Sequence, residues 1–151
     1  MSDWLGQTNQ KLYQARLLID SSENDGVESA LATACEEGAI FQLVLAYQAY
    51  LHELAEIANC REEFISLAQL IEFTPVPTGE MTELRQLETD DFSWLAQLLT
   101  AFESCSHVKK SQAVMAGSIP LVAQGGGQNI RDWYQQLNDI IDLQRLNRQE
   151  S

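Results

Sequence analysis

The sequence is short of basic side chains, and this shortage argues against two classes of partner. Its 151 residues include 9 Lys plus Arg against 22 Asp plus Glu, which gives a formal net charge of −13. A surface of that charge repels the phosphates of nucleic acids and the head groups of anionic lipids. We therefore expect no nucleic-acid partner and no membrane partner.

The sequence also has few side chains that bind metals. Its two histidines are His52 and His107, and its three cysteines form no Cys-x-x-Cys pair. Glu56 follows His52 at the spacing of a metal-binding helix, but the second histidine of that motif is missing. Neither histidine has the preceding glutamate of a di-iron bundle. The sequence predicts no metal and no other cofactor, and it favours a partly exposed His52 that pairs with a carboxylate.

The cysteines, Cys35, Cys60 and Cys105, are far apart in the sequence. This spacing argues against a disulfide framework and favours buried, free thiols. Cys60 lies at the predicted start of a helix, where the helix dipole would favour its thiolate, but a structural cysteine is the preferred interpretation. The sequence offers no catalytic nucleophile and indicates a protein that is not an enzyme.

Long apolar runs are missing as well. No stretch of 18 uninterrupted apolar residues occurs, and the N-terminus, MSDWLGQTNQK, lacks the basic start and apolar core of a secretory signal. The expectation is a cytoplasmic protein without a membrane-spanning helix. A length of 151 residues is typical of one domain, so residues 1–151 are assigned to a single helical domain.

The organising element is a long apolar helix predicted over residues 30–58. Between residues 39 and 51 its polar side chains are Gln42 and Gln48, apart from the tyrosine hydroxyls. A helix that is apolar on more than one face should be surrounded by other helices. Gly38 weakens such a helix by ~1 kcal/mol relative to alanine, so it indicates that a neighbouring helix crosses closely there.

Cap residues and apolar stripes with helical spacing predict further helices around the central one. The first runs to about Asp20 from a cap at Ser2 or Asp3, with Leu5, Leu12, Ala15 and Ile19 facing inward. A helix over residues 61–73 is predicted with Asn59 as its cap, followed by a short helix from 78 or 79 through 87. The last two predicted helices are 92–104, capped by Asp90 or Asp91, and 130–148, capped by Asn129. Pro75 and Pro77 end the third helix because proline lacks an amide donor. The sequence predicts an all-α fold, an antiparallel helical bundle of five or six helices around a long central helix.

Residues 111–130 contain no charged side chain, and a flexible, uncharged loop is predicted at about 106–128. Its apolar residues Ile119, Leu121 and Val122 should pack either over a groove between the helices or on another protein or a second copy. The glycines at 125–127 precede a predicted helix start, a position that favours anions. No strand precedes them and no Lys-Ser/Thr pair follows, so a hinge is preferred to a phosphate site.

Three segments resemble a family of small uncharacterised proteins from gammaproteobacteria, namely pseudomonads and marine relatives. They are WLGQTNQKLYQAR at residues 4–16, SWLAQLL at residues 93–99, and Trp133 with DLQR at residues 142–145. The likeness spans most of the chain, although the stretch 106–127 varies among the relatives. The resemblance implies a cytoplasmic helical fold in such bacteria and transfers no catalytic residue.

The chain is also similar to the HEPN class of helical bundles, in which a long second helix packs against the first. Ribonucleases of that class use an arginine followed four to six residues later by a histidine, and neither His52 nor His107 has such an arginine. This resemblance implies a nucleotide- or RNA-associated helical module that lacks the nuclease motif.

Together these features predict a non-catalytic interaction or structural protein that self-associates, with the HEPN-like module as the alternative. The expected partner is a second copy, giving a homo-oligomer, or another protein. The candidate partner-binding residues are Asn9, Lys11 and Arg16 on the first helix and Ile119, Leu121 and Val122 in the uncharged loop.

Overall fold

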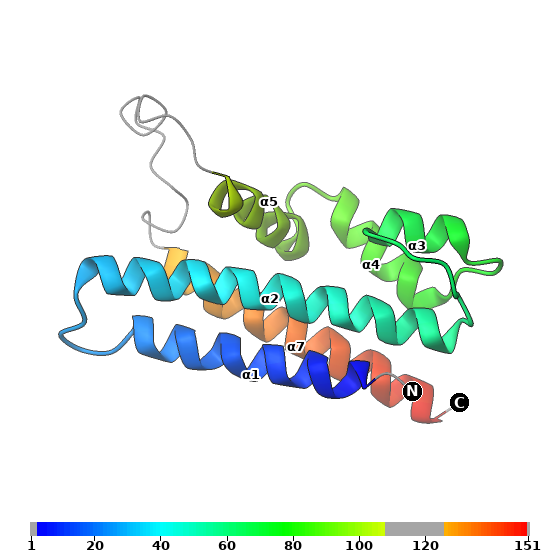
Figure 1. Cartoon of the computed structure of the whole chain (residues 1–151), viewed down its shortest axis with the longest axis horizontal. Coiled ribbons are helices and arrows are strands. Elements are labelled where there is room, and N and C mark those ends of the chain that lie inside the picture. The colour runs from blue at the N-terminus through cyan, green and yellow to red at the C-terminus, as the bar shows by residue number, and fades with distance from the viewer. Residues whose placement is uncertain (1–2, 108–125, 151) are drawn as a thin grey trace.

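The computed structural model describes residues 3–107 and 126–150, and this part of the chain contains six α-helices and no strand. They are α1 (Trp4–Ser22), α2 (Ser29–Ile57), α3 (Leu67–Phe73), α4 (Gly79–Thr89), α5 (Trp94–Ser106) and α7 (Gly126–Glu150). The prediction of an all-α bundle is therefore confirmed. Figure 1 shows the three long helices α1, α2 and α7 running along the long axis, with α3, α4 and α5 on the opposite side of α2 from α1.

The central helix is α2, and its bounds differ from the predicted ones by one residue at each end. Its buried side chains lie between Ala39 and Ala55, and most of them form one core cluster with side chains from the other five described helices. A Cβ added at Gly38 would lie 3.1 Å from Leu18 Cδ1 of α1. The missing side chain at Gly38 therefore lets α1 cross α2 closely, as the glycine predicted.

The first helix is capped by Asp3, whose Oδ1 accepts a hydrogen bond from the Gly6 amide at 2.9 Å. The predicted inward residues Leu12, Ala15 and Ile19 are buried. Leu5 was predicted inward too, but it is 51% exposed, and Thr8 is buried instead. Residues spaced by seven drift by ~20° around a helix, so Leu5 lies at the edge of the inward stripe.

The predicted start of the third helix is wrong, because Asn59 directly follows Ala58, the C-terminal cap of α2, instead of capping α3. Asn59 has a φ of 58°, the left-handed conformation that asparagine tolerates at the end of a helix. The Cys60 amide then donates to the Ala55 carbonyl at 2.9 Å, which closes the last turn of α2. The cap of α3 is Ser66, whose Oγ accepts a hydrogen bond from the Gln69 amide at 3.2 Å.

The cap of α5 is Ser93, not Asp90 or Asp91 as predicted. Ser93 Oγ accepts a hydrogen bond from the amide three residues later at 3.0 Å. Asp90 accepts from the Phe92 amide at 3.0 Å and so shapes the turn between α4 and α5. Phe92 belongs to this turn and not to the helix, and it is 89% exposed.

The last helix begins earlier than predicted. Asn129 lies inside α7 and does not cap it, and the backbone of Gly126 and Gly127 is helical. The first amides of a helix have no partner within the helix, so a glycine destabilises the helix less there than in its interior. The predicted inward residues Trp133, Leu137 and Ile141 are buried, and Ile140 is half-buried. The loop residues between 108 and 125 lie outside the described residues.

Candidate functional site

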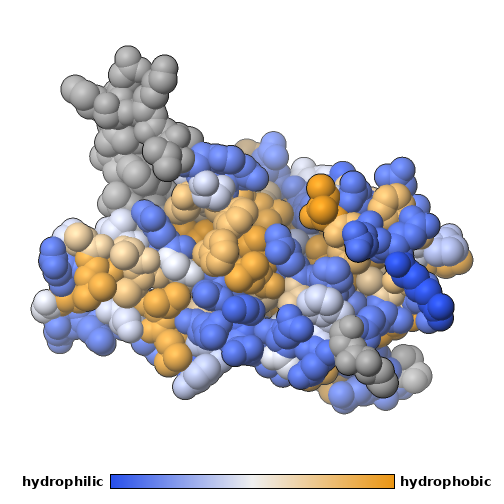
Figure 2. Space-filling view, in the orientation of Figure 1, coloured by the Kyte–Doolittle hydropathy of each residue, from blue (hydrophilic) through white to orange (hydrophobic). Residues whose placement is uncertain are grey.

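The N-terminal half of α2 carries an apolar face that the described helices leave largely open. Leu31 is 54% exposed and Phe41 is 49% exposed. In an apolar window of 18 residues within α2, 33% of the residues are buried. By length and composition alone α2 could cross a membrane, but core helices of soluble proteins have the same properties. Figure 2 shows apolar side chains gathered on this side of the molecule, over α2 and α5.

A groove of about 330 Å³ lies between this face and α5, and we call it the α2–α5 groove. It is lined by Ala34, Glu37, Gly38, Phe41, Phe102, Cys105 and Ser106. The ring centroids of Phe41 and Phe102 are 6.1 Å apart, with 32° between the ring planes. Glu37 is the one charged side chain among these lining residues. The groove can therefore take apolar side chains, and it offers a single carboxylate for polar chemistry.

The thiol of Cys105 is a poor candidate for a nucleophile. All three cysteines are free, but they are half-buried and not fully buried as predicted. Burial, and then the charge of Glu37, raises the pKa of Cys105 in the α2–α5 groove. Cys60 follows the end of α2 and precedes no helix directly, so the predicted helix start that would favour its thiolate is wrong. A raised pKa reduces the thiolate fraction, which is the nucleophilic form.

His52 lies in an aromatic stack, and the carboxylate of Glu56 acts on it through its charge. The Trp4 ring of α1 is stacked on it, with centroids 4.2 Å apart and planes at 14°, and the Phe64 centroid lies 4.5 Å away. Burial lowers the pKa of His52, while the charge of Glu56 acts in the opposite direction. Within residues 3–107 and 126–150, no group of three or more His, Cys, Asp or Glu side chains is placed to hold a metal ion.

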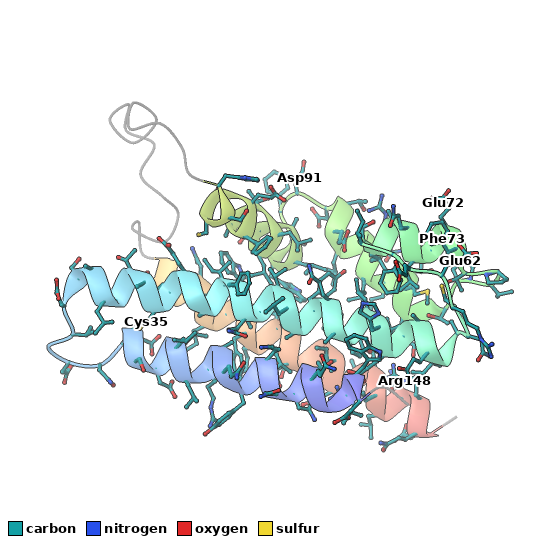
Figure 3. All side chains as sticks on the ribbon, in the orientation of Figure 1. Cys35, Glu62, Glu72, Phe73, Asp91 and Arg148 are labelled. Carbon is teal, nitrogen blue, oxygen red and sulfur yellow. The ribbon has the colours of Figure 1, made fainter. Side chains whose placement is uncertain are left out.

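The polar side chains around the C-terminal half of α2 form ion pairs and hydrogen bonds with each other. Glu53 is 7% exposed and accepts hydrogen bonds from Arg145 of α7 at 2.7 and 3.2 Å. Arg148, labelled in Figure 3, donates to Tyr50 Oη at 3.1 Å and to Glu80 Oε2 of α4 at 2.9 Å. Burial raises the pKa of Tyr50 to about 12, so its hydroxyl stays protonated at neutral pH. These contacts join α2, α4 and α7 and are better suited to structure than to acid–base chemistry.

The predicted partner-binding residues of α1 are not part of the α2–α5 groove. Asn9 Oδ1 accepts a hydrogen bond from Arg145 Nη1 at 2.9 Å, so it ties α1 to α7. Lys11 Nζ donates within α1 at 3.2 Å, and Arg16 lies over the Tyr13 ring with Cζ 5.2 Å from the centroid. The other candidates, Ile119, Leu121 and Val122, lie outside the described residues.

The sequence did not reveal the α2–α5 groove, because it predicted that the apolar middle of the central helix, which includes Phe41, is surrounded by other helices. One signal was present: Leu31, Ala34 and Phe41 recur at intervals of three and seven residues, which is one face of a helix. The sequence did not indicate how far α5 extends along α2. In the structure α5 does not cover the N-terminal end of α2 (Figure 1).

The fold and the α2–α5 groove define an all-α helical bundle with an apolar groove on its surface. The chain belongs to DUF6586, a family of unknown function, because the model of that family matches residues 1–151. No curated protein and no solved structure matches the chain. The prediction of an uncharacterised family is confirmed at this level, while the bacterial distribution and the HEPN likeness stay predictions.

Proposed function

We propose that this protein is a non-catalytic interaction protein that self-associates through the α2–α5 groove and the adjoining apolar face of α2. The observation that carries the proposal is the exposure of Leu31 and Phe41, at 54% and 49%, on the helix that forms the core elsewhere. Large apolar side chains gathered beside a groove are typical of a protein–protein interface. The single charged side chain in the groove, Glu37, leaves most of it free for apolar contacts.

A second copy of the chain suits this surface. Leu31, Ala34 and Phe41 share one helix face, so two α2 helices can pack side by side around a twofold axis. In such an arrangement the same patch serves both copies, and the small side chain of Ala34 allows the two helix axes to approach closely. Each Phe41 then loses its remaining exposure to water.

Cysteine crosslinking tests the proposed surface. Ala34→Cys is introduced into a chain in which the native thiols are removed by Cys35→Ser, Cys60→Ser and Cys105→Ser. Mild oxidation should link two copies through position 34. The matched control is Phe92→Cys in the same background, because Phe92 is 89% exposed in the α4–α5 turn, outside the groove. Equal crosslinking at both positions would contradict the proposed surface, and a chain that never assembles would contradict self-association itself.

The alternative, an HEPN-like nucleotide- or RNA-associated module without nuclease chemistry, stays a prediction. His52 is engaged in the aromatic stack, and His107 Nε2 lies 3.1 Å from Glu103 Oε2. A rise in the melting temperature with ATP, GTP or short RNA would favour this alternative. The cytoplasmic location and the lack of nucleic-acid and membrane partners rest on the charge and N-terminal sequence, and they also stay predictions.

A further inference from the structure

A second groove lies between α4 and α7 and shares no lining residue with the α2–α5 groove. We call it the α4–α7 groove, and its volume is about 550 Å³. The side chain of Gln144 on α7 donates to Glu83 Oε1 of α4 at 2.7 Å, and Arg148 donates to Glu80 Oε2 at 2.9 Å. These contacts join the two helices at one end, and the groove extends along both helices from there.

The two walls of the groove have the same helical spacing. The lining positions are 83, 86, 87 and 90 along α4 and its C-terminal cap, and 136, 139, 140 and 143 on α7. Both sets follow the i, i+3, i+4, i+7 pattern of one helix face. Each wall is therefore about two turns long, or ~10 Å at ~1.5 Å per residue. A third helix can pack against two ridges of this kind.

Apolar side chains form part of the lining. Leu87 of α4, Ile140 of α7 and Trp94 at the start of α5 are half-buried, and Leu143 of α7 is 54% exposed. A helix that lay in the groove would remove the remaining apolar surface of these four side chains from water. Burial of that surface would favour its binding.

Three carboxylates give the groove its charge. Glu83, Asp90 and Asp139 line it, and none of its lining residues is Lys or Arg. Their hydrogen-bond donors are neutral amides, two from glutamine side chains at 2.7 and 2.9 Å and one from the backbone at 3.0 Å. Within the described part of the chain, no ion pair neutralises these three charges. The groove is therefore complementary to a ligand that is both apolar and positively charged.

We propose that the α4–α7 groove docks a short, basic amphipathic helix of a partner protein. The apolar face of that helix packs on Leu87, Ile140 and Leu143, and lysines or arginines at its edges pair with Asp90 and Asp139. A second copy of this chain is a poorer occupant, because none of its described helices carries more than one basic side chain in excess of its acidic ones. The proposal does not depend on self-association through the α2–α5 groove.

Calorimetric titration of the full chain with designed peptides tests this proposal. The probe is a 14-residue peptide of lysine and leucine with its leucines at helical i, i+3, i+4, i+7 positions, and its control is a scrambled peptide of identical composition. The helical probe should bind with one site per chain and more tightly than the scrambled peptide. Binding should weaken as the salt concentration rises, because exposed ion pairs are screened.

Two double variants locate the site. Asp90→Asn with Asp139→Asn keeps the hydrogen-bond acceptors but removes two charges from the groove. It should weaken binding by a factor between about 2 and 30. The control, Asp91→Asn with Asp132→Asn, makes the same change in net charge at exposed positions outside the groove and should leave the affinity unchanged.

Three results would overturn the proposal. The first is equal weakening in the two double variants, which would mean that net charge alone attracts the peptide. The second is equal affinity for the helical and scrambled peptides, which would mean that the groove does not recognise an amphipathic helix. The third is no binding of the helical peptide at millimolar concentration. None of these results depends on the oligomeric state, so the self-association proposal is tested separately.

Discussion

The substitution Phe41→Glu should separate the copies of this protein while leaving each copy folded. Phe41 lies at the α2–α5 groove with 49% of its surface exposed, and its ring is 6.1 Å from that of Phe102. The glutamate can turn toward water in a single copy. In an assembly it would be forced into an apolar contact, where an unpaired carboxylate is strongly disfavoured.

The expected effect follows from the area that remains exposed. Complete burial of a phenylalanine side chain contributes ~1.5–3 kcal/mol. With 49% of Phe41 still exposed, about half of that amount, ~0.7–1.5 kcal/mol, is available to association in each copy. A symmetric dimer uses Phe41 twice, so its loss costs ~1.5–3 kcal/mol, which is a ~10- to 150-fold rise in Kd. The buried carboxylates add to this, so the upper part of the range is expected.

Sedimentation velocity over a concentration series measures the Kd directly. Phe92→Glu is the matched control, because it places the same new charge on an apolar side chain that is 89% exposed and lines neither groove. The control should assemble like the unmodified chain. Circular dichroism of both variants checks that the helices persist. The reasoning is refuted if Phe41→Glu, still folded, associates as tightly as the control.

Three further predictions concern the bundle itself. Gly38→Leu places side-chain atoms where a Cβ alone would lie 3.1 Å from a leucine methyl of α1. Overpacking of this kind should lower the free energy of unfolding by ~1–3 kcal/mol and Tm by several degrees. An unchanged Tm would mean that α1 does not cross α2 closely at this point. Arg145→Met leaves Glu53, which is 7% exposed, without its cation, so the free energy of unfolding measured in urea should fall by ~3 kcal/mol. Adding Glu53→Met should largely restore this stability, and a double variant as unstable as the single one would contradict the pairing. Because burial lowers the pKa of His52 below its ordinary value of 6.5, the unfolded chain takes up the proton first, and stability should fall as pH drops below about 6.5. Urea unfolding between pH 5 and 7.5 should show that stability depends less steeply on pH in His52→Gln than in the unmodified chain. An identical pH dependence in the two proteins would exclude His52 as a contributor.

The fold could be predicted from the sequence where one local signal dominated. The apolar run of α2 predicted the bounds of that helix to within one residue at each end. It also predicted the central position of α2, because a helix that is apolar on several faces is stable when other helices surround it. Asn59 was ambiguous, since asparagine serves both as an N-cap and as a left-handed residue at a helix end. The correct cap of α3 was visible in the pair Ser66 and Gln69, whose side chains each accept a backbone amide at this helix start. That pattern is close to a capping box.

The candidate grooves could not be predicted in the same way, because they depend on contacts between distant segments. Arg145 reaches Glu53, which lies 92 residues earlier, and Asn9, which lies 136 residues earlier. No spacing rule along the chain connects such residues. The exposure of Phe41 likewise depends on where α5 ends over α2, and this is a property of the packed bundle. Sequence patterns therefore identified which helices are apolar, but not which apolar faces the described bundle leaves open.

Self-association through α2 is the central claim, and the mass of the unmodified chain in solution tests it most directly. Size-exclusion chromatography with light scattering should give a mass that rises with concentration from that of one copy, 17.0 kDa, toward twice that value. A constant mass of 17.0 kDa up to millimolar concentration would contradict the claim.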